Sequence, residues 1–395
     1  MERMIITKSF DAFTKAVKSL YGELSATPER VVKEMFSKLD GVDWKNPDLK
    51  ILDPAAGFGT FLREAYIRLK EFHSEEHILN NMLYACEING FKTLFLERKM
   101  GLRNIYKGDF LTMKLPEGWP KEFDIVVSNP PYSKNLHLKF LEKSFFIAEE
   151  ILFVHPSTWL LDEKGSSKNY AEIKKLIGNK IKSIDFFNGN PIFGINLYVP
   201  CVITHIDNKK NTNKILCKDL INDTIFEYSD INTINKFSNT ELYPGLKSKI
   251  LNYVGKNCSI KEYSDRDGIF YLNLSEIRGH GETNTINKMV KDDFYTFVPK
   301  SYTIKERKDA KYFNCGFPTE GEAYNFLNYL KSDFARFCLS IYKINSTLAG
   351  TSSVLNSVPW LDFTQEWTDE NLYAHFQISE EEQEFIKEII PPYYD

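Results

Sequence analysis

Between residues 49 and 206 the chain alternates short apolar runs with stretches of helical periodicity, and this alternation constrains the fold most strongly. The apolar runs lie at 49–53, 82–88, near 105, and at 123–128, 151–154, 181–187 and 197–206. The helical stretches lie at about 60–70, 90–100, 136–150 and 169–178. Such a pattern predicts an α/β fold, in which a mostly parallel sheet has helices on both faces. Ligands of such sheets bind at the carboxyl ends of the strands.

A glycine-rich segment follows the first apolar run and reads Asp-Pro-Ala-Ala-Gly-Phe-Gly-Thr-Phe-Leu over residues 53–62. Gly57 and Gly59 lack a β-carbon, so a ligand can approach the backbone of this strand-to-helix turn. The alternative interpretation is a tight turn without a ligand. Asp53 is poorly placed for a phosphate but suits a positively charged group. The segment therefore favours a cationic nucleoside cofactor, and the absence of a Gly-x-x-x-x-Gly-Lys-Ser/Thr sequence argues against a nucleotide triphosphate.

Two further acidic residues lie at or just after the ends of predicted strands. Glu87 ends the run at 82–88, where a carboxylate can accept hydrogen bonds from both hydroxyls of a ribose. Asp109 could accept a hydrogen from the amino group of an adenine ring, with Phe110 stacked on that ring. A solvated loop carboxylate is the alternative for each. Because three acidic strand ends occur in order along the chain, we expect them to share one cofactor site.

The segment Asn129-Pro130-Pro131-Tyr132 comes directly after the run at 123–128. An exocyclic amine of a nucleobase is a weak nucleophile but has two hydrogens that acceptors can hold. The Asn129 side-chain oxygen and the Pro130 carbonyl are suitable acceptors, so catalysis would come mainly from positioning and electrostatics. The prolines stiffen the loop, and Tyr132 offers a flat face to a flipped base. The alternative is a simple Pro-Pro turn after a buried strand.

Together the two motifs resemble those of the γ-type N6-adenine DNA methyltransferases of restriction–modification systems and phages. The family also has a Thr-Pro segment before the glycine motif, and Thr27-Pro28 matches that segment. The same pair predicts the start of a helix, with Thr27 as the cap and Pro28 at the first helical position. Ala56 and Phe58 depart from the usual cysteine and serine but leave the glycines. The resemblance covers residues 20–207 and implies a Rossmann-like methyltransferase sheet that binds S-adenosylmethionine.

The resemblance implies site-specific methyl transfer to the N6 amino group of a flipped adenine in double-stranded DNA. It implies that the cofactor contacts Thr27, Asp53, Ala55, Gly57, Gly59, Glu87, Asp109 and Phe110. It implies that Asn129, Pro130 and Tyr132 act at the amine. A second aromatic ring on the other face of the adenine is expected in this family; Phe193 is our candidate, with Phe186 and Phe187 as alternatives that we expect in the core.

The character of the sequence changes after a polar segment at 208–213. We expect residues 1–48 to form N-terminal helices that complete the cofactor site, 49–210 to form the methyltransferase domain, and 215–395 to form an α+β region that recognises the DNA target. The last region contains a basic run with interleaved aromatics at 297–311. We expect it to contact DNA phosphates through Lys300, Lys305, Arg307 and Lys308. The alternative is a solvated loop.

Composition restricts the partners and the compartment. The formal net charge is −4, so a DNA surface must be local. No apolar run approaches the roughly 20 residues that span a bilayer, and the six cysteines form no Cys-x-x-Cys pair that would predict a zinc site. We expect a cytoplasmic protein that has no metal and is a monomer or weak dimer. The expected partners are double-stranded DNA and a cognate restriction endonuclease.

Two other functions fit parts of the sequence. RNA and protein-glutamine amine methyltransferases can carry Asn-Pro-Pro-Tyr, although the release-factor enzymes are shorter and place their extra domain before the fold. A non-catalytic DNA-recognition subunit is the other alternative. The intact Asp53, Asn129 and Tyr132 argue against that last interpretation.

Overall fold

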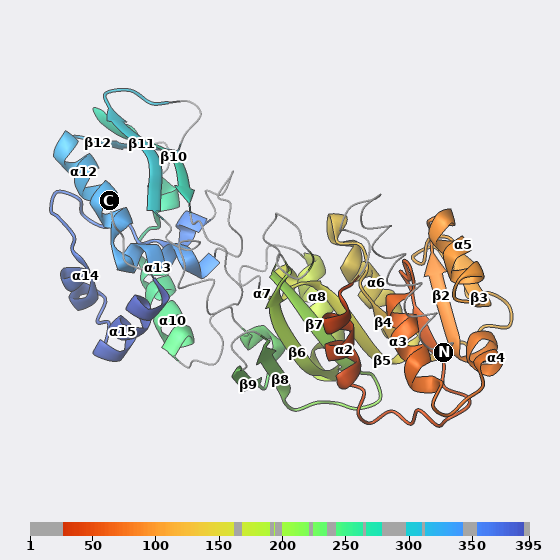
Figure 1. Cartoon of the computed structure of the whole chain (residues 1–395). Helices are drawn as coiled ribbons and strands as arrows, with labels where there is room; N and C mark the ends of the chain where they lie inside the picture. Colours follow the sequence, from red (N-terminus) through yellow and green to blue (C-terminus); the bar gives the residue numbers. More distant parts are fainter. Residues whose placement is uncertain are drawn as a thin grey trace. The chain divides into compact units, whose positions relative to one another are not determined.

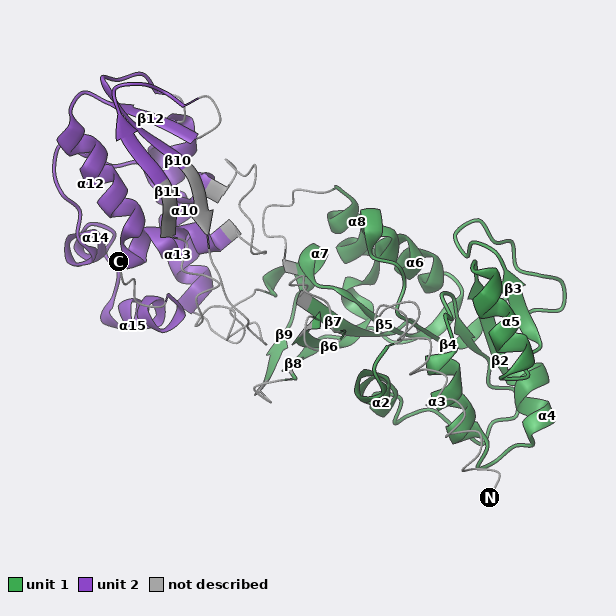
Figure 2. Cartoon of the chain, turned by 45° about the horizontal axis from the view of Figure 1, so that its top comes forward, with its two compact units in different colours: residues 1–160, 167–234 green, residues 161–166, 235–395 purple. Residues whose placement is uncertain are grey.

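The computed structural model describes residues 27–161, 168–189, 193, 200–220, 224–234, 242–263, 266–278, 298–309, 313–342 and 354–390. The chain divides into two compact units, which Figure 2 draws in different colours. Unit 1 comprises residues 1–160 and 167–234, and unit 2 comprises residues 161–166 and 235–395. Of the N-terminal helices that we expect at 1–48, residues 1–26 lie outside the described residues.

Unit 1 is built on a sheet of nine strands in the order β3-β2-β1-β4-β5-β7-β6-β8-β9 (Figure 1). The strands are β1 (Ile51–Asp53), β2 (Leu83–Glu87), β3 (Asn104–Lys107), β4 (Phe123–Ser128), β5 (Ala148–Pro156), β6 (Ile181–Asn188), β7 (Pro200–Asp207), β8 (Ile215–Asp219) and β9 (Thr224–Tyr228). The helices are α2 (Glu29–Ser37), α3 (Thr60–Leu69), α4 (Glu75–His77), α5 (Gly90–Arg98), α6 (Leu136–Phe145), α7 (Thr158–Leu161) and α8 (Lys168–Ile177).

The first five strands of this sheet run parallel, as the alternation of the sequence predicts. β1 pairs in parallel with β2 and β4, and β5 continues the parallel series beside β4. β7 is inserted antiparallel between β5 and β6, and β9 is antiparallel to β8. The prediction of an α/β, Rossmann-like sheet is therefore confirmed, with an antiparallel strand that the alternation does not reveal.

Helices cover both faces of the sheet, with α2 and α3 on one side and α6 and α8 on the other (Figure 2). Val32 and Phe36 of α2 are buried with Leu62 of α3 in a core that includes alternate residues of β5, Leu152 and Val154. Because successive side chains of a strand point to opposite faces, this alternation assigns one face of β5 to α2 and α3. α2 thereby fixes the position of Thr27, which comes just before it.

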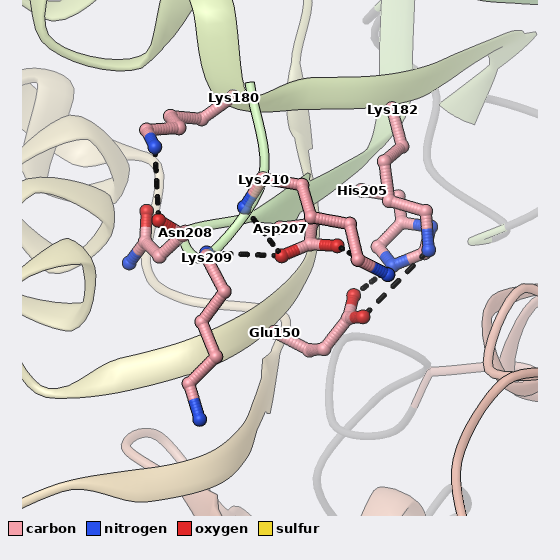
Figure 3. A network of polar contacts seen from close by, with 8 residues as sticks. All are labelled: Glu150, Lys180, Lys182, His205, Asp207, Asn208, Lys209 and Lys210. Carbon is pink, nitrogen blue, oxygen red and sulfur yellow. Dashed lines mark hydrogen bonds and ion pairs between the residues drawn. The ribbon is translucent and has the colours of Figure 1, made fainter. Parts of the chain in front are cut away.

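A polar network joins the antiparallel strand β7 to the sheet at the end where β5 begins (Figure 3). His205 Nε2 lies 2.5 Å from Glu150 Oε2, and Lys182 Nζ lies 3.6 Å from the other oxygen of Glu150. Asn208 donates from Nδ2 to the carbonyls of Phe145 and Ala148 at 2.8 and 2.7 Å. These contacts fix the register of β7 against β5, which the sequence pattern alone leaves open.

Unit 2 contains a sheet of three antiparallel strands in the order β11-β10-β12 (Figure 1). Its strands are β10 (Phe270–Arg278), β11 (Val298–Lys305) and β12 (Phe313–Phe317). Its helices are α10 (Leu242–Lys256), α12 (Glu320–Lys331), α13 (Asp333–Tyr342), α14 (Asp369–His375) and α15 (Glu380–Ile389). α12 begins at the cap Thr319 and α15 at the cap Ser379, and each cap accepts a hydrogen bond from a backbone N–H of the first turn.

Three expectations need correction. The sheet of unit 1 continues through β8 and β9, so the boundary expected at 210–215 lies later, after Ile234. The helix expected at 136–150 ends at Phe145, because Ala148 already pairs with Phe123 of β4. Thr27 does not cap α2: Pro28 occupies the cap position without a side-chain hydrogen bond.

Candidate active site

A cavity of about 680 Å³ opens at the carboxyl ends of β1, β2 and β4. It brings together residues from both sequence motifs and from the N-terminal segment. Its walls are formed by Thr27, Pro54, Ala55, Ala56, Gly57, Phe58, Thr60, Phe61, Glu87, Ile88, Lys92, Gly108, Asp109, Phe110, Leu111, Asn129, Pro130, Pro131, Tyr132, Leu136, Phe140 and Phe193. Of the twelve residues that we predicted at the cofactor and the amine, ten line this cavity, and Asp53 and Gly59 do not.

The glycine loop needs its two glycines for backbone reasons. Gly57 and Gly59 have φ values of 57° and 76°, in the left-handed region that side chains with a β-carbon disfavour. A β-carbon on Gly59 would lie 2.3 Å from Met100 Sδ and 2.8 Å from a methyl group of Leu96. Gly59 therefore shapes the start of α3 from behind the loop, while Gly57 forms part of the cavity wall.

Asp53 is fully buried behind the loop. Its Oδ1 accepts hydrogen bonds from the Ala55 backbone N–H at 3.0 Å and from the Ser128 hydroxyl at 3.1 Å. Its Oδ2 is buried and has no hydrogen-bond partner. Burial raises the pKa of Asp53 from its ordinary value of 3.8 to about 7, against the two hydrogen bonds and with a contribution from the nearby Glu87.

Glu87 holds the glycine loop to the end of β2. Its Oε2 accepts from the Gly57 N–H at 2.8 Å, and its Oε1 accepts from the Asn89 N–H at 2.7 Å. Each carboxylate oxygen can accept more than one hydrogen bond. The side chain therefore organises the loop and still offers acceptor capacity to the cavity; its contact with a ribose stays a prediction.

Asp109 and Phe110 form the next part of the wall. Asp109 Oδ1 accepts from the Leu111 N–H at 2.9 Å. The ring of Phe110 is buried against Phe140, with centroids 5.2 Å apart. Lys143 lies over the ring at 4.9 Å and donates to the Phe110 carbonyl at 2.5 Å. The sequence did not single out Lys143, which fixes the backbone of this wall.

The Asn129 amide lies between two hydroxyl groups. Its Nδ2 donates to Thr27 Oγ1 at 3.0 Å, and its Oδ1 accepts from the Tyr132 hydroxyl at 2.6 Å. The Tyr132 oxygen lies 3.5 Å from the Val154 carbonyl, a much weaker contact. Thr27, which precedes α2, is buried, with 7% of its surface exposed. Burial raises the pKa of Tyr132 well above its ordinary value, so the hydroxyl keeps its proton.

Two buried histidines behind Tyr132 were missed in the sequence. The His137 ring meets the Tyr132 ring edge-to-face at 5.9 Å, and neither of its nitrogens has a hydrogen-bond partner. Burial lowers the pKa of His137 to about 4. His155 Nδ1 accepts from Trp159 Nε1 at 3.1 Å, so its Nε2 carries the proton that it donates to Thr204 Oγ1 at 2.9 Å. Burial keeps both imidazoles neutral; a histidine inside an α/β core has no distinctive sequence signal.

Phe193 lines the cavity and packs near Phe187, with ring centroids 6.2 Å apart. Phe186 and Phe187 have 1% and 3% of their surface exposed, and neither lines the cavity. The three aromatic rings therefore separate as expected between the core and the cavity wall. Whether Phe193 contacts an adenine stays a prediction.

The predicted DNA-contacting residues lie in unit 2, at the end of β11 and in the loop after it. Lys305, Arg307 and Lys308 are exposed. Lys308 Nζ pairs with Asp267 at 2.8 Å. Lys300 lies within β11, and its side chain is outside the described part of the chain.

Two buried asparagines fix the backbone of this basic loop. Asn273, with 1% of its surface exposed, donates to the Arg307 carbonyl at 3.2 Å and accepts from the Asp309 N–H at 2.7 Å. Asn314 accepts from the same N–H at 2.9 Å and donates to the Asp309 carbonyl at 2.9 Å. A loop held in one conformation loses less entropy when it binds a partner, so the cations are presented from an ordered backbone.

Within the described ranges, no three His, Cys, Asp or Glu side chains are grouped so that they could hold a metal ion. None of the described helices is both long and apolar enough to cross a membrane.

Two curated relatives match parts of the chain. An uncharacterized adenine-specific methylase of Mycoplasma pneumoniae is 32% identical over 83 residues, which cover 19% of each chain. The methylase subunit of the type I restriction enzyme MjaVII from Methanocaldococcus jannaschii is 32% identical over 114 residues, covering 27% of this chain and 18% of that protein. The chain therefore matches less than a fifth of the length of either curated relative.

Among solved structures, a modification subunit of a putative type I restriction enzyme from Vibrio vulnificus has a TM-score of 0.44 and 18% identity. That match covers 53% of this chain and 50% of the other. The family model described as N-6 DNA methylase matches residues 9–158. The resemblance to N6-adenine DNA methyltransferases that the two motifs indicate is therefore confirmed, and over residues 9–158 the chain carries the sequence pattern of the N-6 DNA methylase family.

Proposed function

We propose that this protein transfers a methyl group from S-adenosylmethionine to the N6 amino group of a flipped adenine in double-stranded DNA. One observation carries the proposal: the glycine loop, the strand-end acids Glu87 and Asp109, and the segment from Asn129 to Tyr132 line a single cavity. A methyltransferase needs its cofactor-binding and amine-binding residues in one cavity, because the amine nitrogen must approach the methyl group of the donor directly. The family match over residues 9–158 supports the same chemistry.

The side chains around the cavity suit a cationic nucleoside. Glu87 and Asp109 lie in its wall, Asp53 lies behind it with an unpartnered oxygen, and Lys92 is the single basic side chain among the wall residues. A positive charge in this cavity would stabilise the ionised form of Asp53, which burial disfavours. We propose that Glu87 binds the ribose, that Asp109 and Phe110 hold the adenine ring, and that the glycine loop faces the methionine portion. The bound cofactor would supply an electrophilic methyl group.

The protein's own contribution at the amine is positioning. Asn129 Oδ1 has a second lone pair besides the one that Tyr132 uses, and the Pro130 carbonyl is the other acceptor beside it. Two acceptors that hold the two amine hydrogens direct the nitrogen lone pair away from the base plane. We propose that the ring faces of Tyr132 and Phe193 receive the flipped adenine.

We further propose that unit 2 contacts the DNA through the basic loop that Asn273 and Asn314 hold in place. Lys305 and Arg307 carry the positive charge with which it would contact phosphates, and Lys308 would first have to leave Asp267. We also propose a cognate restriction endonuclease as a partner, since one relative is the methylase subunit of a type I restriction enzyme.

The test compares genomic DNA from cells that lack other adenine methylation and express the wild type or Asn129→Ala. We expect the wild type to place N6-methyladenine at one recurring sequence. Asn129→Ala should place none, because the amine loses its side-chain acceptor, while calorimetry should still detect S-adenosylmethionine binding. The control is Asn213→Ala, which alters an exposed asparagine outside the cavity and should methylate as the wild type does.

Either of two results would contradict the proposal. The first is wild-type DNA without N6-methyladenine although the purified protein binds the cofactor, which would favour an RNA or protein substrate. The second is full methylation by Asn129→Ala.

A further inference from the structure

The two hydroxyl groups beside Asn129 decide which way its amide points. The proposed reaction requires the oxygen, not the nitrogen, to face the substrate amine, because a flipped amide would present a donor to a donor. Hydroxyl groups can donate or accept, so contacts to Thr27 and Tyr132 do not by themselves fix the amide. What fixes it is where each hydroxyl sends its one hydrogen.

Tyr132 sends its hydrogen to the amide oxygen. The Tyr132 oxygen lies 2.6 Å from Asn129 Oδ1 but 3.5 Å from the Val154 carbonyl, which is the other acceptor nearby. A hydrogen bond at the longer distance is weak. Tyr132 therefore acts as the donor on the oxygen side of the amide.

Thr27 receives a hydrogen from the amide nitrogen. Thr27 Oγ1 lies 3.0 Å from Asn129 Nδ2, and the same threonine lines the cavity. If an acceptor-only group in the cavity, such as a carboxylate, takes the Thr27 hydrogen, only the lone pairs of Oγ1 remain for Asn129. The amide nitrogen is then held at Thr27, and the amide oxygen must point toward Tyr132 and the amine.

We infer that Thr27 is a positioning residue that sets the orientation of the Asn129 amide, so that occupancy of the cofactor site by an anionic group prepares the acceptor for the amine. This inference rests on the proposed function and assigns Thr27 a second role beside cofactor contact. Its energetic basis is one buried hydrogen bond, which corresponds to about a fivefold effect on an equilibrium or a rate.

Thr27→Val removes the hydroxyl and keeps the branched shape. At saturating cofactor we expect its methylation rate to fall about fivefold to tenfold, because the amide is then held from the Tyr132 side alone. Thr27→Ser keeps the hydroxyl and should restore most of the rate. A second measurement needs no reaction: a double-mutant cycle of Thr27→Val and Asn129→Ala, read by urea unfolding of the free protein, should show coupling equivalent to about fivefold in the unfolding equilibrium constant.

A third measurement concerns the cofactor. Calorimetry should show that Thr27→Val weakens binding of S-adenosylhomocysteine, which has a carboxylate. It should leave 5′-methylthioadenosine, which has none, almost unaffected.

Two outcomes would overturn the inference. In the first, Thr27→Val reaches the wild-type rate once the cofactor saturates, so that Thr27 affects the cofactor KM alone. In the second, the two substitutions act additively in the free protein, so that Thr27 does not hold the amide. If instead the coupling is present but the wild type methylates no DNA, the proposed function fails while the orientation of the amide stands.

Discussion

Replacing Asp53 by asparagine should change how the stability of the protein depends on pH. The side chain is fully buried, and one of its oxygens lacks a partner. Burial raises its pKa from 3.8 to about 7. In the unfolded chain the carboxyl group ionises near its ordinary value, so the folded state binds an extra proton between these two pH values.

The sign and the size follow from this proton. Because the raised pKa belongs to the folded state, the protonated group favours folding at low pH, and this contribution is lost as pH rises toward 7. One pKa unit corresponds to about 1.4 kcal/mol, so the loss over about three units is about 4 kcal/mol. Above pH 7 the ionised carboxylate is buried in the folded state, and the cost no longer changes with pH.

Urea unfolding of the wild type and of Asp53→Asn at pH 5, 6, 7 and 8 measures this effect. The free energy of unfolding of the variant, relative to the wild type, should rise by about 1.4 kcal/mol per unit up to pH 7 and then level off. The asparagine Nδ2 lacks an acceptor, which adds a constant offset but no slope. His137, whose pKa of about 4 makes the protein less stable as pH falls below 6.5, is present in both proteins and cancels in the difference.

Ser128→Ala serves as the matched control, because its hydroxyl lowers the pKa of Asp53. Without that hydrogen bond the levelling-off should move to higher pH. If the free energies of unfolding of the wild type and Asp53→Asn differ by the same amount at pH 5 and pH 8, Asp53 does not titrate in this range. That result would refute the reasoning from its burial.

Two other predictions concern the DNA-binding surface and the glycine loop. Replacing Lys305, Arg307 and Lys308 together by glutamine should weaken DNA binding and reduce the slope of log affinity against log salt by about 2. The expected change is smaller than three unpaired cations would give, because Lys308 pairs with Asp267. The slope is measured by fluorescence anisotropy, and an unchanged slope would show that the loop does not contact phosphates. Gly59→Ala should destabilise unit 1 by roughly 1–3 kcal/mol in urea unfolding, from the left-handed φ and the clash with Met100. Adding Met100→Ala should recover part of that loss, and no recovery would contradict the clash.

The sequence predicts the part of the site that depends on position along the strands. Glu87, Asp109 and Asn129 lie at or just after strand ends, and parallel strands necessarily bring those ends to one edge of the sheet. The direction of each side chain is a different matter. Asp53 also ends a strand, but its side chain is fully buried and accepts hydrogen bonds from the Ala55 N–H and the Ser128 hydroxyl.

Contacts between segments far apart in the chain could not be predicted from local patterns. Thr27-Pro28 matches a local capping signal, yet the Thr27 hydroxyl is bound to Asn129, 102 positions later. The polar segment at 208–213 signals a domain boundary, but β8 beyond it pairs with β6 and keeps the following residues in unit 1. Local propensity describes the structure that a segment favours by itself, whereas the Thr27 hydrogen bond and the pairing of β8 depend on residues far away in the chain.

The insertion of β7 between β5 and β6 has a consequence for synthesis on the ribosome. Both motifs, which span residues 53–132, leave the ribosome well before β7 at Pro200–Asp207. Until then β5 lacks its antiparallel neighbour. β6, whose buried Asp185 pairs with Lys38 at the end of α2, also lacks its pairing with β7. Long-range pairings of this kind form late, because the chain between them must first be available. A nascent chain halted before residue 200 should therefore carry the complete binding motifs and still fail to retain the cofactor.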